Sequence, residues 1–467
     1  MVVPRTLLIP LIVACALFME QMDSTVISTS LPALAVDMAV DPIALKLALT
    51  SYLLSLAVFI PISGWMADRF GSRTIFRAAI AVFMLGSILC GISHSLPQFV
   101  LARFFQGIGG AMMVPVGRLV VLRSVDKANL VRALSYLTIP AMLGPVMGPV
   151  LGGFITTYFH WRWIFFINMP IGILGLYLAT RFIPQIRAEQ SAPLDWVGFC
   201  WSALGCSALM MGMATVGRHL VSTDISLACI ALGIVGLLFY VRHARRCSNP
   251  LIDLALLKIE TLRAGVLGGS LFRIGIGAIP FLLPLMLQLG FGYSAFQSGL
   301  LTCFSAAGAM FMKTVAVKFL QRFGFRTVLM VNGSIAVFSF IAIGAFDSSM
   351  PYALMAGILL IGGCLRSLQF TSLNAISYAD VTQRDLSQAT SIASVAQQLS
   401  VGMGVTLGGL ALQLSMAVQG HTTLVTADFW PAFLVVGIMA ATSIPLLIRL
   451  PRDAGAELSG RGKTRPG

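Results

Sequence analysis

The amino-acid sequence predicts an all-α integral membrane protein with fourteen membrane-spanning helices. These helices are expected to form two parallel six-helix repeats with two inserted helices between them. The first observation is composition: the 467 residues are 57% hydrophobic and only 10% charged, with a mean hydropathy of +0.91. Because a soluble domain carries about 25% charged residues, this chain cannot present a normal aqueous surface. The other two observations are a series of long apolar segments and an internal repeat.

The internal repeat is an eight-residue basic turn that occurs twice. Its first copy covers residues 69–76 (RFGSRTIF) and its second copy residues 322–329 (RFGFRTVL), with five identical positions. The copies are 253 positions apart, and each lies between two long apolar runs. Repeated bundles of membrane helices are typical of secondary transporters, whose substrate site lies between the halves.

The long apolar segments give the fourteen expected spans, each near or above the roughly 20 residues that cross a bilayer. In chain order the spans cover residues 6–34, 43–67, 75–93, 97–121, 131–157, 163–182, 195–216, 224–242, 263–288, 295–318, 327–346, 351–374, 387–416 and 428–450. The first is too long for a cleaved signal peptide and is expected to remain as a span. An even number of spans places both termini on one side.

The basic residues assign both termini to the cytoplasm. Of the 31 lysines and arginines, 25 fall on the side of the termini. The opposite side has Lys46, Arg162 and Arg218, and three more lie within spans: Arg103, Arg273 and Arg366. Cytoplasmic loops of membrane proteins carry the excess of basic residues, so this distribution sets the orientation.

The repeat extends beyond the turn and sets the expected domain boundaries. Residues 108–110 (IGG) align with 361–363 at the same offset, and residues 151–153 (LGG) align with 407–409. Spans 1–6 therefore match spans 9–14, and spans 7 and 8 are inserted. The expected parts are an N-terminal six-helix half (1–182), an inserted helix pair with its linkers (183–262), a C-terminal six-helix half (263–450) and a disordered cytoplasmic tail (451–467).

Several function classes are excluded by composition and spacing. A net charge of +14 would suggest nucleic acid in a soluble protein, but the basic residues lie in short loops between apolar runs, so no nucleic-acid partner is expected. The eight cysteines occur singly, without Cys-x-x-Cys or His/Cys ligand spacing, and are expected to pack as small hydrophobes. We therefore expect no metal, no cofactor, no catalytic residue and no enzyme activity.

The first basic turn carries an acid among its arginines. Residues 64–73 (GWMADRFGSR) resemble the G-x-x-x-D-R-x-G-x-R loop of the major facilitator superfamily. Gly71 allows a tight turn with positive φ, and Asp68 with Arg69 and Arg73 is expected to form a charged latch between helices at the cytoplasmic face. The alternative is a plain basic turn that only sets the topology.

The fourth span carries a charge inside an apolar run. Residues 103–109 (RFFQGIG) resemble the R-x-x-Q-G-x-G motif of the same superfamily. A charge at that place costs several kcal/mol unless it is paired or hydrated, so Arg103 is expected to take part in proton movement or gating. The alternative is that Arg103 extends its head group to the outer face, which is about two turns away.

The fifth span is rich in glycine and proline. Residues 144–153 (GPVMGPVLGG) resemble the G-P-x-x-G-G motif of antiporters, and the residues concerned are Gly144, Pro145, Gly148, Pro149, Gly152 and Gly153. Two prolines remove two helix hydrogen bonds and are expected to bend the helix. Glycines four apart let a neighbouring helix approach closely, which is also the plainer alternative role of this stretch.

The first span contains two acids deep in the apolar layer. Residues 20–32 (EQMDSTVISTSLP) resemble the L-D-x-T-I-V-N-V-A-L-P motif of fourteen-span drug:proton antiporters, with departures at Met22 and Ser28. Glu20 and Asp23 are three apart and share one helix face. Acids at this depth are expected to face a cavity and to carry protons or bind cations. The alternative is that Arg103 neutralises an acid in a fixed ion pair.

The remaining signals are a tryptophan-rich stretch and two arginines in the second half. Residues 161–172 (WRWIFFINMPIG) resemble a stretch of the same branch and are expected to anchor the outer interface. Arg273 occupies the repeat position of Glu20, and Arg366 lies beside the glycines at 362–363. Both are candidates for contact with substrate anions in a cavity, or for pairing with Glu20 or Asp23.

The resemblance to the fourteen-span drug:proton antiporter branch covers the chain from Glu20 to about Leu450. It implies a multi-pass antiporter of the bacterial inner membrane that uses protons to export lipophilic or cationic drug-like compounds by alternating access. Its partners would be a small-molecule substrate, protons and the lipid bilayer; the sequence gives no signal about a periplasmic adaptor. Two alternatives stay open: export of one endogenous metabolite, siderophore or amphipathic lipid, and a non-transporting membrane sensor or scaffold.

Overall fold

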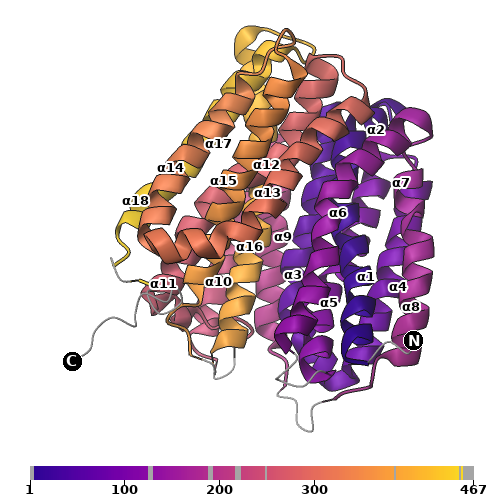
Figure 1. Cartoon of the computed structure of the whole chain (residues 1–467), viewed down its shortest axis with the longest axis vertical. Helices are drawn as coiled ribbons and strands as arrows, with labels where there is room; N and C mark the ends of the chain where they lie inside the picture. The colour runs from indigo at the N-terminus through magenta and orange to yellow at the C-terminus, as the bar shows by residue number, and fades with distance from the viewer. Residues whose placement is uncertain are drawn as a thin grey trace. The chain divides into compact units, whose positions relative to one another are not determined.

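The computed structural model describes residues 5–124, 130–187, 193–215, 222–247, 250–382, 385–451 and 454–455. These residues form helices joined by short turns, and no strand occurs among them (Figure 1). The predicted all-α class is therefore confirmed. The predicted tail 451–467 lies almost entirely outside the described residues, as do the orientation signals Lys127, Arg218 and Arg384.

The first half of the chain is built from long helices with a few short ones at their ends. In order they are α1 (Arg5–Val26), η1 (Ile27–Ser30), α2 (Leu31–Asp37), η2 (Pro42–Leu45), α3 (Lys46–Phe70), α4 (Ser72–Ile92), α5 (Leu96–Ser124), α6 (Leu130–Tyr158), α7 (Trp163–Phe166) and α8 (Asn168–Phe182). The predicted span boundaries in this half differ from the helix ends by a few residues.

The second half continues in the same way after the inserted pair. The inserted helices are α9 (Trp196–Thr215) and α10 (Thr223–Ala244), followed by η4 (Leu254–Lys258), α11 (Glu260–Arg263), η5 (Ala264–Gly268), α12 (Gly269–Leu285), η6 (Met286–Gly290), α13 (Ala295–Phe323), α14 (Phe325–Gly344), α15 (Tyr352–Ser377), α16 (Leu386–Gln419), η7 (Thr426–Asp428), α17 (Phe429–Ala441) and α18 (Ser443–Ile448). The segments η5 and η6 are π-helical and flank α12.

Thirteen helical segments of the described chain are long and apolar enough to cross a membrane. The helix α6, with 29 residues and a strongly apolar composition, lies at the place of the predicted span 131–157. A multi-pass membrane protein is therefore confirmed. The total of fourteen spans and the cytoplasmic side of the termini stay predictions.

The chain groups into two compact units. The first comprises Met1–Phe199 with Ser294–Gly299, and the second comprises Cys200–Tyr293 with Leu300–Gly467. Each unit contains one copy of the basic turn. The finer division at residues 182, 262 and 450 stays a prediction.

Glycines set the helix packing in the first unit. The helix α1 packs along α6, and α5 packs against both α3 and α4. A Cβ atom added at Gly109 of α5 would lie 2.6 Å from the backbone of α4 at Ala79 and at Phe83. Only glycine permits so close an approach, so this residue type decides where α4 and α5 meet.

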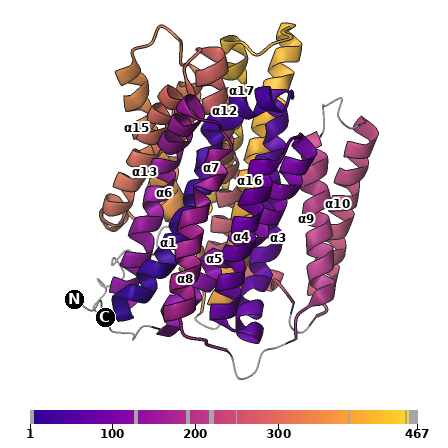
Figure 2. The same ribbon diagram turned by 90° about the vertical axis from the view of Figure 1, so that its right-hand side faces the viewer.

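The second unit repeats this packing plan. The helix α12 packs along α16, and α14 packs against α15, just as α1 packs along α6 and α4 against α5. The inserted helices α9 and α10 lie side by side (Figure 2), with the rings of Trp201 and Phe239 stacked at 4.8 Å. Gly205 and Gly233 would place an added Cβ within 3.0 Å of the opposite helix of this pair. The recurrence of helix pairs supports the repeat that the sequence predicts.

The two copies of the basic turn have the same geometry. Gly71 and Gly324 have φ of +93° and +78°, a conformation that favours glycine. In each copy the glycine N–H donates to a carbonyl four residues earlier, at Ala67 and at Leu320, over 2.9 Å. The predicted positive φ at Gly71 is confirmed, and the repeat predicted from sequence is also a repeat of backbone conformation.

Candidate functional site

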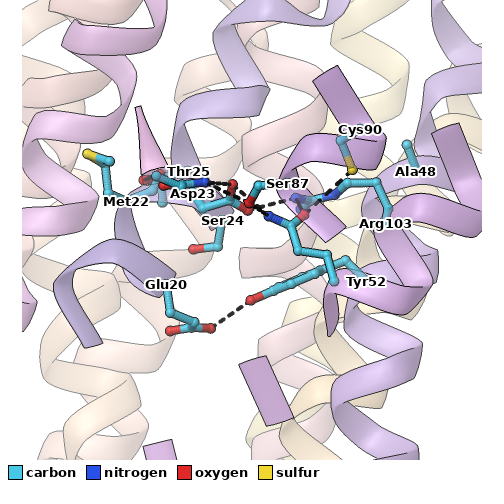
Figure 3. A network of polar contacts seen from close by, with 12 residues as sticks. Glu20, Met22, Asp23, Ser24, Thr25, Ala48, Tyr52, Ser87, Cys90 and Arg103 are labelled. Atoms are coloured by element: carbon cyan, nitrogen blue, oxygen red, sulfur yellow. Dashed lines mark hydrogen bonds and ion pairs between the residues drawn. The ribbon is translucent and has the colours of Figure 1, made fainter. Parts of the chain in front are cut away.

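A network of polar side chains is buried inside the first unit around residues 20–25 of α1. Its members come from α1, α3, α4, α5 and α8, and Figure 3 labels Glu20, Asp23, Tyr52, Ser87 and Arg103 among them. The five largest, Glu20, Asp23, Tyr52, Arg103 and Gln106, are each at most 4% exposed. Polar groups so deeply buried are costly unless they are hydrogen bonded, so their partners decide what they can do.

The centre of the network is an ion pair between Asp23 of α1 and Arg103 of α5. The Nη1 atom of Arg103 lies 2.7 Å from Oδ2 of Asp23. The other carboxylate oxygen, Oδ1, accepts from Gln106 Nε2 at 3.0 Å and from Asn168 Nδ2 at 2.7 Å. One cation and two amide donors therefore compensate the charge of Asp23.

The helix α4 supports this ion pair from one side. The Ser87 hydroxyl accepts from Gln106 Nε2 at 2.7 Å and from Asn168 Nδ2 at 3.1 Å, so it fixes both amides that hold Asp23. Next to it, a Cβ atom added at Gly86 would lie 2.5 Å from the Cα of Gln106. The glycine thus lets α4 come close enough for Ser87 to reach the network.

Glu20 lies one turn before Asp23 and has different partners. The Tyr52 hydroxyl donates to Glu20 Oε1 over 2.9 Å, and Gln21 donates to Oε2. The face of the Tyr52 ring lies 4.4 Å from the Arg103 guanidinium carbon, which is a cation–π contact. Tyr52 of α3 therefore contacts Glu20 on one side and the Asp23–Arg103 pair on the other (Figure 3).

The structure brings together the three residues predicted for proton coupling. Arg103 is 1% exposed and paired, so the alternative in which its head group reaches the outer face is wrong. The ion pair of Asp23 with Arg103, which was the other alternative, is present. Proton exchange at Asp23 and Glu20 stays a prediction.

The predicted latch at the basic turn has a different partner. Asp68 pairs with Arg123 at the end of α5, with 2.8 Å between Oδ1 and Nη2. The expected charged contact between helices is therefore present with a different arginine, and no ion pair of Asp68 with Arg69 or Arg73 occurs among the described residues. The turn is also tied to the segment after α8, since Gln185 Nε2 donates to the Phe70 carbonyl and Ser72 N–H donates to the Ile186 carbonyl. A gating function for this ion pair stays a prediction.

The glycine- and proline-rich stretch lies inside α6, which continues as one helix through Pro140, Pro145 and Pro149. Its glycines face α1. A Cβ added at Gly144 would lie 2.9 Å from the Met22 nitrogen, and Gly148 and Gly152 contact α1 at Thr25 and Val26. Gly153 instead contacts residues 295–296. The predicted close approach of a neighbour is confirmed, and that neighbour is the helix that carries the two acids; the predicted bend stays a prediction.

The two arginines predicted for the second half are both buried in the second unit. Arg273 of α12 donates to Asn374 Oδ1 at 2.7 Å and to the Gly265 carbonyl at 3.4 Å. Arg366 of α15 donates to the hydroxyls of Ser305 and Ser339. Asp23 has its cation in Arg103 and Glu20 its donor in Tyr52, so these contacts take the place of the suggested pairing with Arg273 or Arg366. Contact with substrate stays a prediction for both.

Sequence reasoning missed four members of the site. Tyr52 and Ser87 carry no motif signal, because a tyrosine or serine in an apolar span has no distinctive pattern. Gln106 was visible in the motif around Arg103. Asn168 was visible in the tryptophan-rich stretch assigned to anchoring; its neighbours Trp161 and Arg162 do bind Asp37 at the end of α2, at 3.1 and 3.2 Å. The sequence signal for Asn168 was an amide side chain inside an apolar run, where it needs a polar partner.

Comparison with known proteins identifies the family. The model of the Major Facilitator Superfamily matches residues 13–246 and 265–466. The chain belongs to the major facilitator superfamily. As a member of this family of transporters it is a multi-pass protein of the bacterial inner membrane and not an enzyme.

Relatives and solved structures agree with this assignment. The chain is 37% identical to proteins from Pectobacterium atrosepticum and Klebsiella pneumoniae, which both carry the name multidrug resistance protein MdtD. The matches cover 95% of both chains in the first case, and 98% of this chain and 97% of the relative in the second. Among solved structures, a D-xylose–proton symporter has a TM-score of 0.69 at 15% identity, covering 96% of this chain and 98% of its own. A bacterial homologue of the lysosomal transporter Spinster has a TM-score of 0.67 at 16% identity, covering 99% of both. At this identity the structures support the fold alone.

Proposed function

We propose that this protein is a proton-driven antiporter that exports lipophilic or cationic drug-like compounds from the cytoplasm by alternating access. The observation that carries the proposal is the buried Asp23–Arg103 ion pair, with Glu20 joined to it through Tyr52. Ionisable groups inside a membrane protein are costly and are typical of ion pathways and proton relays. The name of the MdtD relatives agrees with drug export.

The geometry suggests how proton binding would act on the helices. A proton that binds the Asp23 carboxylate removes its negative charge and with it the ion pair that ties α1 to α5. The same stretch of α1 packs on the glycines of α6, so a shift of α1 also changes the α1–α6 interface. A contact that is strong in one protonation state and weak in the other biases an equilibrium between two conformations.

The driving force is sufficient for export against a gradient. A proton that crosses a potential of 100 mV releases about 2.3 kcal/mol. This free energy corresponds to a concentration ratio of about 50-fold for each proton exchanged. An acidic outer side adds to it.

A second candidate function is export of one endogenous anionic metabolite on the same fold. It is favoured by the two buried arginines of the second unit, because their positive charges would repel a cationic substrate and attract an anionic one. A panel of unrelated dyes and antiseptics, tested in a host that lacks its own pumps, separates the two. Resistance to several compounds supports the multidrug function, and resistance to none supports the single metabolite.

The proton assignment is tested with Asp23→Asn and Glu20→Gln in proteoliposomes that carry a pH gradient. We expect Asp23→Asn to abolish substrate-dependent proton release while the protein stays folded, because asparagine keeps the shape but cannot bind the proton. Ethidium is the substrate probe, and an internal pH-sensitive dye gives the proton readout. The matched control is Asp224→Asn, which makes the same chemical change at an exposed position in the first turn of α10. Normal coupled transport by both Asp23→Asn and Glu20→Gln would show that the assignment is wrong.

A further inference from the structure

The second unit contains two buried positive charges without a buried negative partner. Arg273 and Arg366 are 1% and 6% exposed. In the described part of the chain, no carboxylate lies within 4.0 Å of either guanidinium. The buried arginine of the first unit, by contrast, has Asp23 at 2.7 Å.

Both arginines lie far from the ends of their spans. Arg366 is the fifteenth residue of α15, about 21 Å along that helix. Arg273 is thirteen residues after the start of the span Glu260–Gly290, about 20 Å from that end. A charge at the centre of a membrane helix is costly, and such residues are typical of substrate and ion pathways.

The contacts of Arg273 are with hydrogen-bond acceptors. Its Nη2 donates to the side-chain carbonyl of Asn374, its Nη1 donates to the backbone carbonyl of Gly265, and the ring of Phe370 lies 5.4 Å from its guanidinium carbon. The two carbonyl oxygens and the face of the ring engage the guanidinium, including both of its Nη atoms. Arg273 therefore contributes positive charge to the region but is held in place by the protein itself.

The contacts of Arg366 are with hydroxyl groups, which can donate as well as accept. Its Nη2 donates to Ser305 Oγ at 2.8 Å, and its Nη1 donates to Ser339 Oγ at 3.3 Å. The Ser339 hydroxyl gives its own hydrogen to the Ala336 carbonyl at 2.7 Å, whereas Ser305 accepts from Arg366 and keeps its hydrogen for another acceptor. The Ser305 hydroxyl is only partly buried. A guanidinium beside a partly exposed hydroxyl with a hydrogen to give is a donor set suited to a carboxylate, sulfonate or phosphate.

We propose that Arg366 and Ser305 bind an anionic group of the exported compound, with Arg273, which contacts Phe370 and Asn374 further along α15, as a second positive charge of the unit. The bound anion supplies the charge compensation that the described residues of this unit do not. The inference rests on the proposed export function and extends its substrate class to amphiphiles that carry a negative group, either alone or together with a positive one. In the first unit the acids receive protons or cations; in the second unit the arginines receive the anion.

A bracing function for Arg366 is the competing explanation, since its two hydrogen bonds join α15 to α13 and α14. A brace holds the fold for every ligand alike. Anion recognition depends on the charge of the ligand. Two dyes with one ring system and opposite charge therefore separate the explanations.

The test measures binding of fluorescein, which is anionic, and rhodamine 123, which is cationic, to the purified full-length protein in detergent micelles by fluorescence anisotropy. Both dyes share the xanthene ring system. For Arg366→Gln we expect fluorescein binding to weaken about tenfold or more, the loss of a charge-assisted contact, while rhodamine 123 binding changes less than twofold. Arg366→Lys keeps the charge and should retain part of the fluorescein affinity. The matched control is Lys318→Gln, which removes an exposed positive charge from α13 of the same unit.

Three results would overturn the proposal. These are an equal loss for both dyes in Arg366→Gln, an unchanged affinity for both, and an absence of fluorescein binding by the wild type where rhodamine 123 binds. Binding is measured without a proton gradient, so the result does not depend on whether Asp23 carries protons. If Asp23→Asn and Glu20→Gln both transport normally but Arg366→Gln selectively weakens fluorescein binding, the anion site is supported and the proton assignment is wrong. If Asp23→Asn abolishes proton coupling but Arg366→Gln affects both dyes equally, the antiporter function is supported and the anion site is wrong.

Discussion

The two units share one plan of helix packing, but their buried ionisable side chains differ in charge. In the first unit the buried arginine, Arg103, is paired with a buried acid, and a second acid lies one turn away. In the second unit Arg273 and Arg366 are buried with neutral partners only, as far as the described residues show. The helix pairs α1–α6 and α12–α16, and the turns at Gly71 and Gly324, are nevertheless equivalent. Duplication therefore preserved backbone geometry while the charged side chains diverged.

The pattern Arg-x-x-Gln illustrates this difference between the units. It occurs at Arg103–Gln106 in α5 and at Arg366–Gln369 in α15. The repeat offset of 253 would place the second copy at 356–359, so the observed copy lies ten residues, about 15 Å, further along its helix. Gln106 binds Asp23, whereas Gln369 accepts from Asn332 at 3.1 Å. The same residue pair thus lies at a different depth and serves a different network.

The largest expected effect is on the ion pair of the first unit. Arg103→Met leaves the Asp23 carboxylate buried without a cation, and we expect the free energy of unfolding to fall by about 3–5 kcal/mol. Arg366→Met, the comparison in the second unit, breaks two hydrogen bonds but also removes an uncompensated charge, so its loss should stay under about 1 kcal/mol. Unfolding titrations in SDS on the purified proteins measure both.

A double variant separates charge from packing in this prediction. Adding Asp23→Asn to Arg103→Met removes the orphaned charge and should restore most of the lost stability. Equal losses in the free energy of unfolding for Arg103→Met and Arg366→Met would show that the paired and the unpaired arginine do not differ in their contribution to stability.

A smaller effect tests the shared scaffold. Gly148 of α6 and Gly404 of α16 are 256 positions apart, the same offset that aligns the two Leu-Gly-Gly stretches. A Cβ at Gly148 would overlap the Thr25 side chain in α1, and a Cβ at Gly404 would overlap the backbone carbonyl of Ile274 in α12. We expect Gly→Ala at either position to destabilise the protein by about 1–3 kcal/mol through overpacking.

The control for this pair is Gly357→Ala, where an added Cβ has nothing within 4 Å. That change should be neutral or stabilising by up to about 1 kcal/mol, since alanine favours helix. Thermal unfolding of the three variants in micelles gives the comparison. A large loss at Gly148 with none at Gly404 would show that the two helix interfaces are not equivalent.

The smallest effect concerns the duplicated turn. Gly71→Ala and Gly324→Ala both force a Cβ into positive φ, which costs about 1–2 kcal/mol at each place. The loss at Gly71 should exceed that at Gly324 by no more than about 1.5 kcal/mol, because the added Cβ displaces the Gln185 side chain and its hydrogen bond to the Phe70 carbonyl. Thermal unfolding of both variants measures the difference, and a discrepancy of several kcal/mol would contradict the equivalence of the turns.

Local patterns in the sequence determined the class of this protein. Hydropathy and charge gave a helical membrane protein, the repeated turn gave its duplication, and the apolar setting of Asp23, Glu20 and Arg103 marked them as site residues. These features depend on properties read within a few turns of one helix, such as side-chain polarity and helical periodicity.

Only the tertiary structure decided which side chains meet. Asp23 pairs with Arg103, which is 80 residues away in the sequence, and binds Asn168, which is 145 residues away. Glu20 accepts from Tyr52 of α3, and Asp68 pairs with Arg123 of α5. The separation of paired and unpaired arginines between the units became visible in the same way. The physical reason is that helices approach where glycines permit, as at Gly86, Gly109 and Gly148, and the rotation and depth of each contact then select the partners.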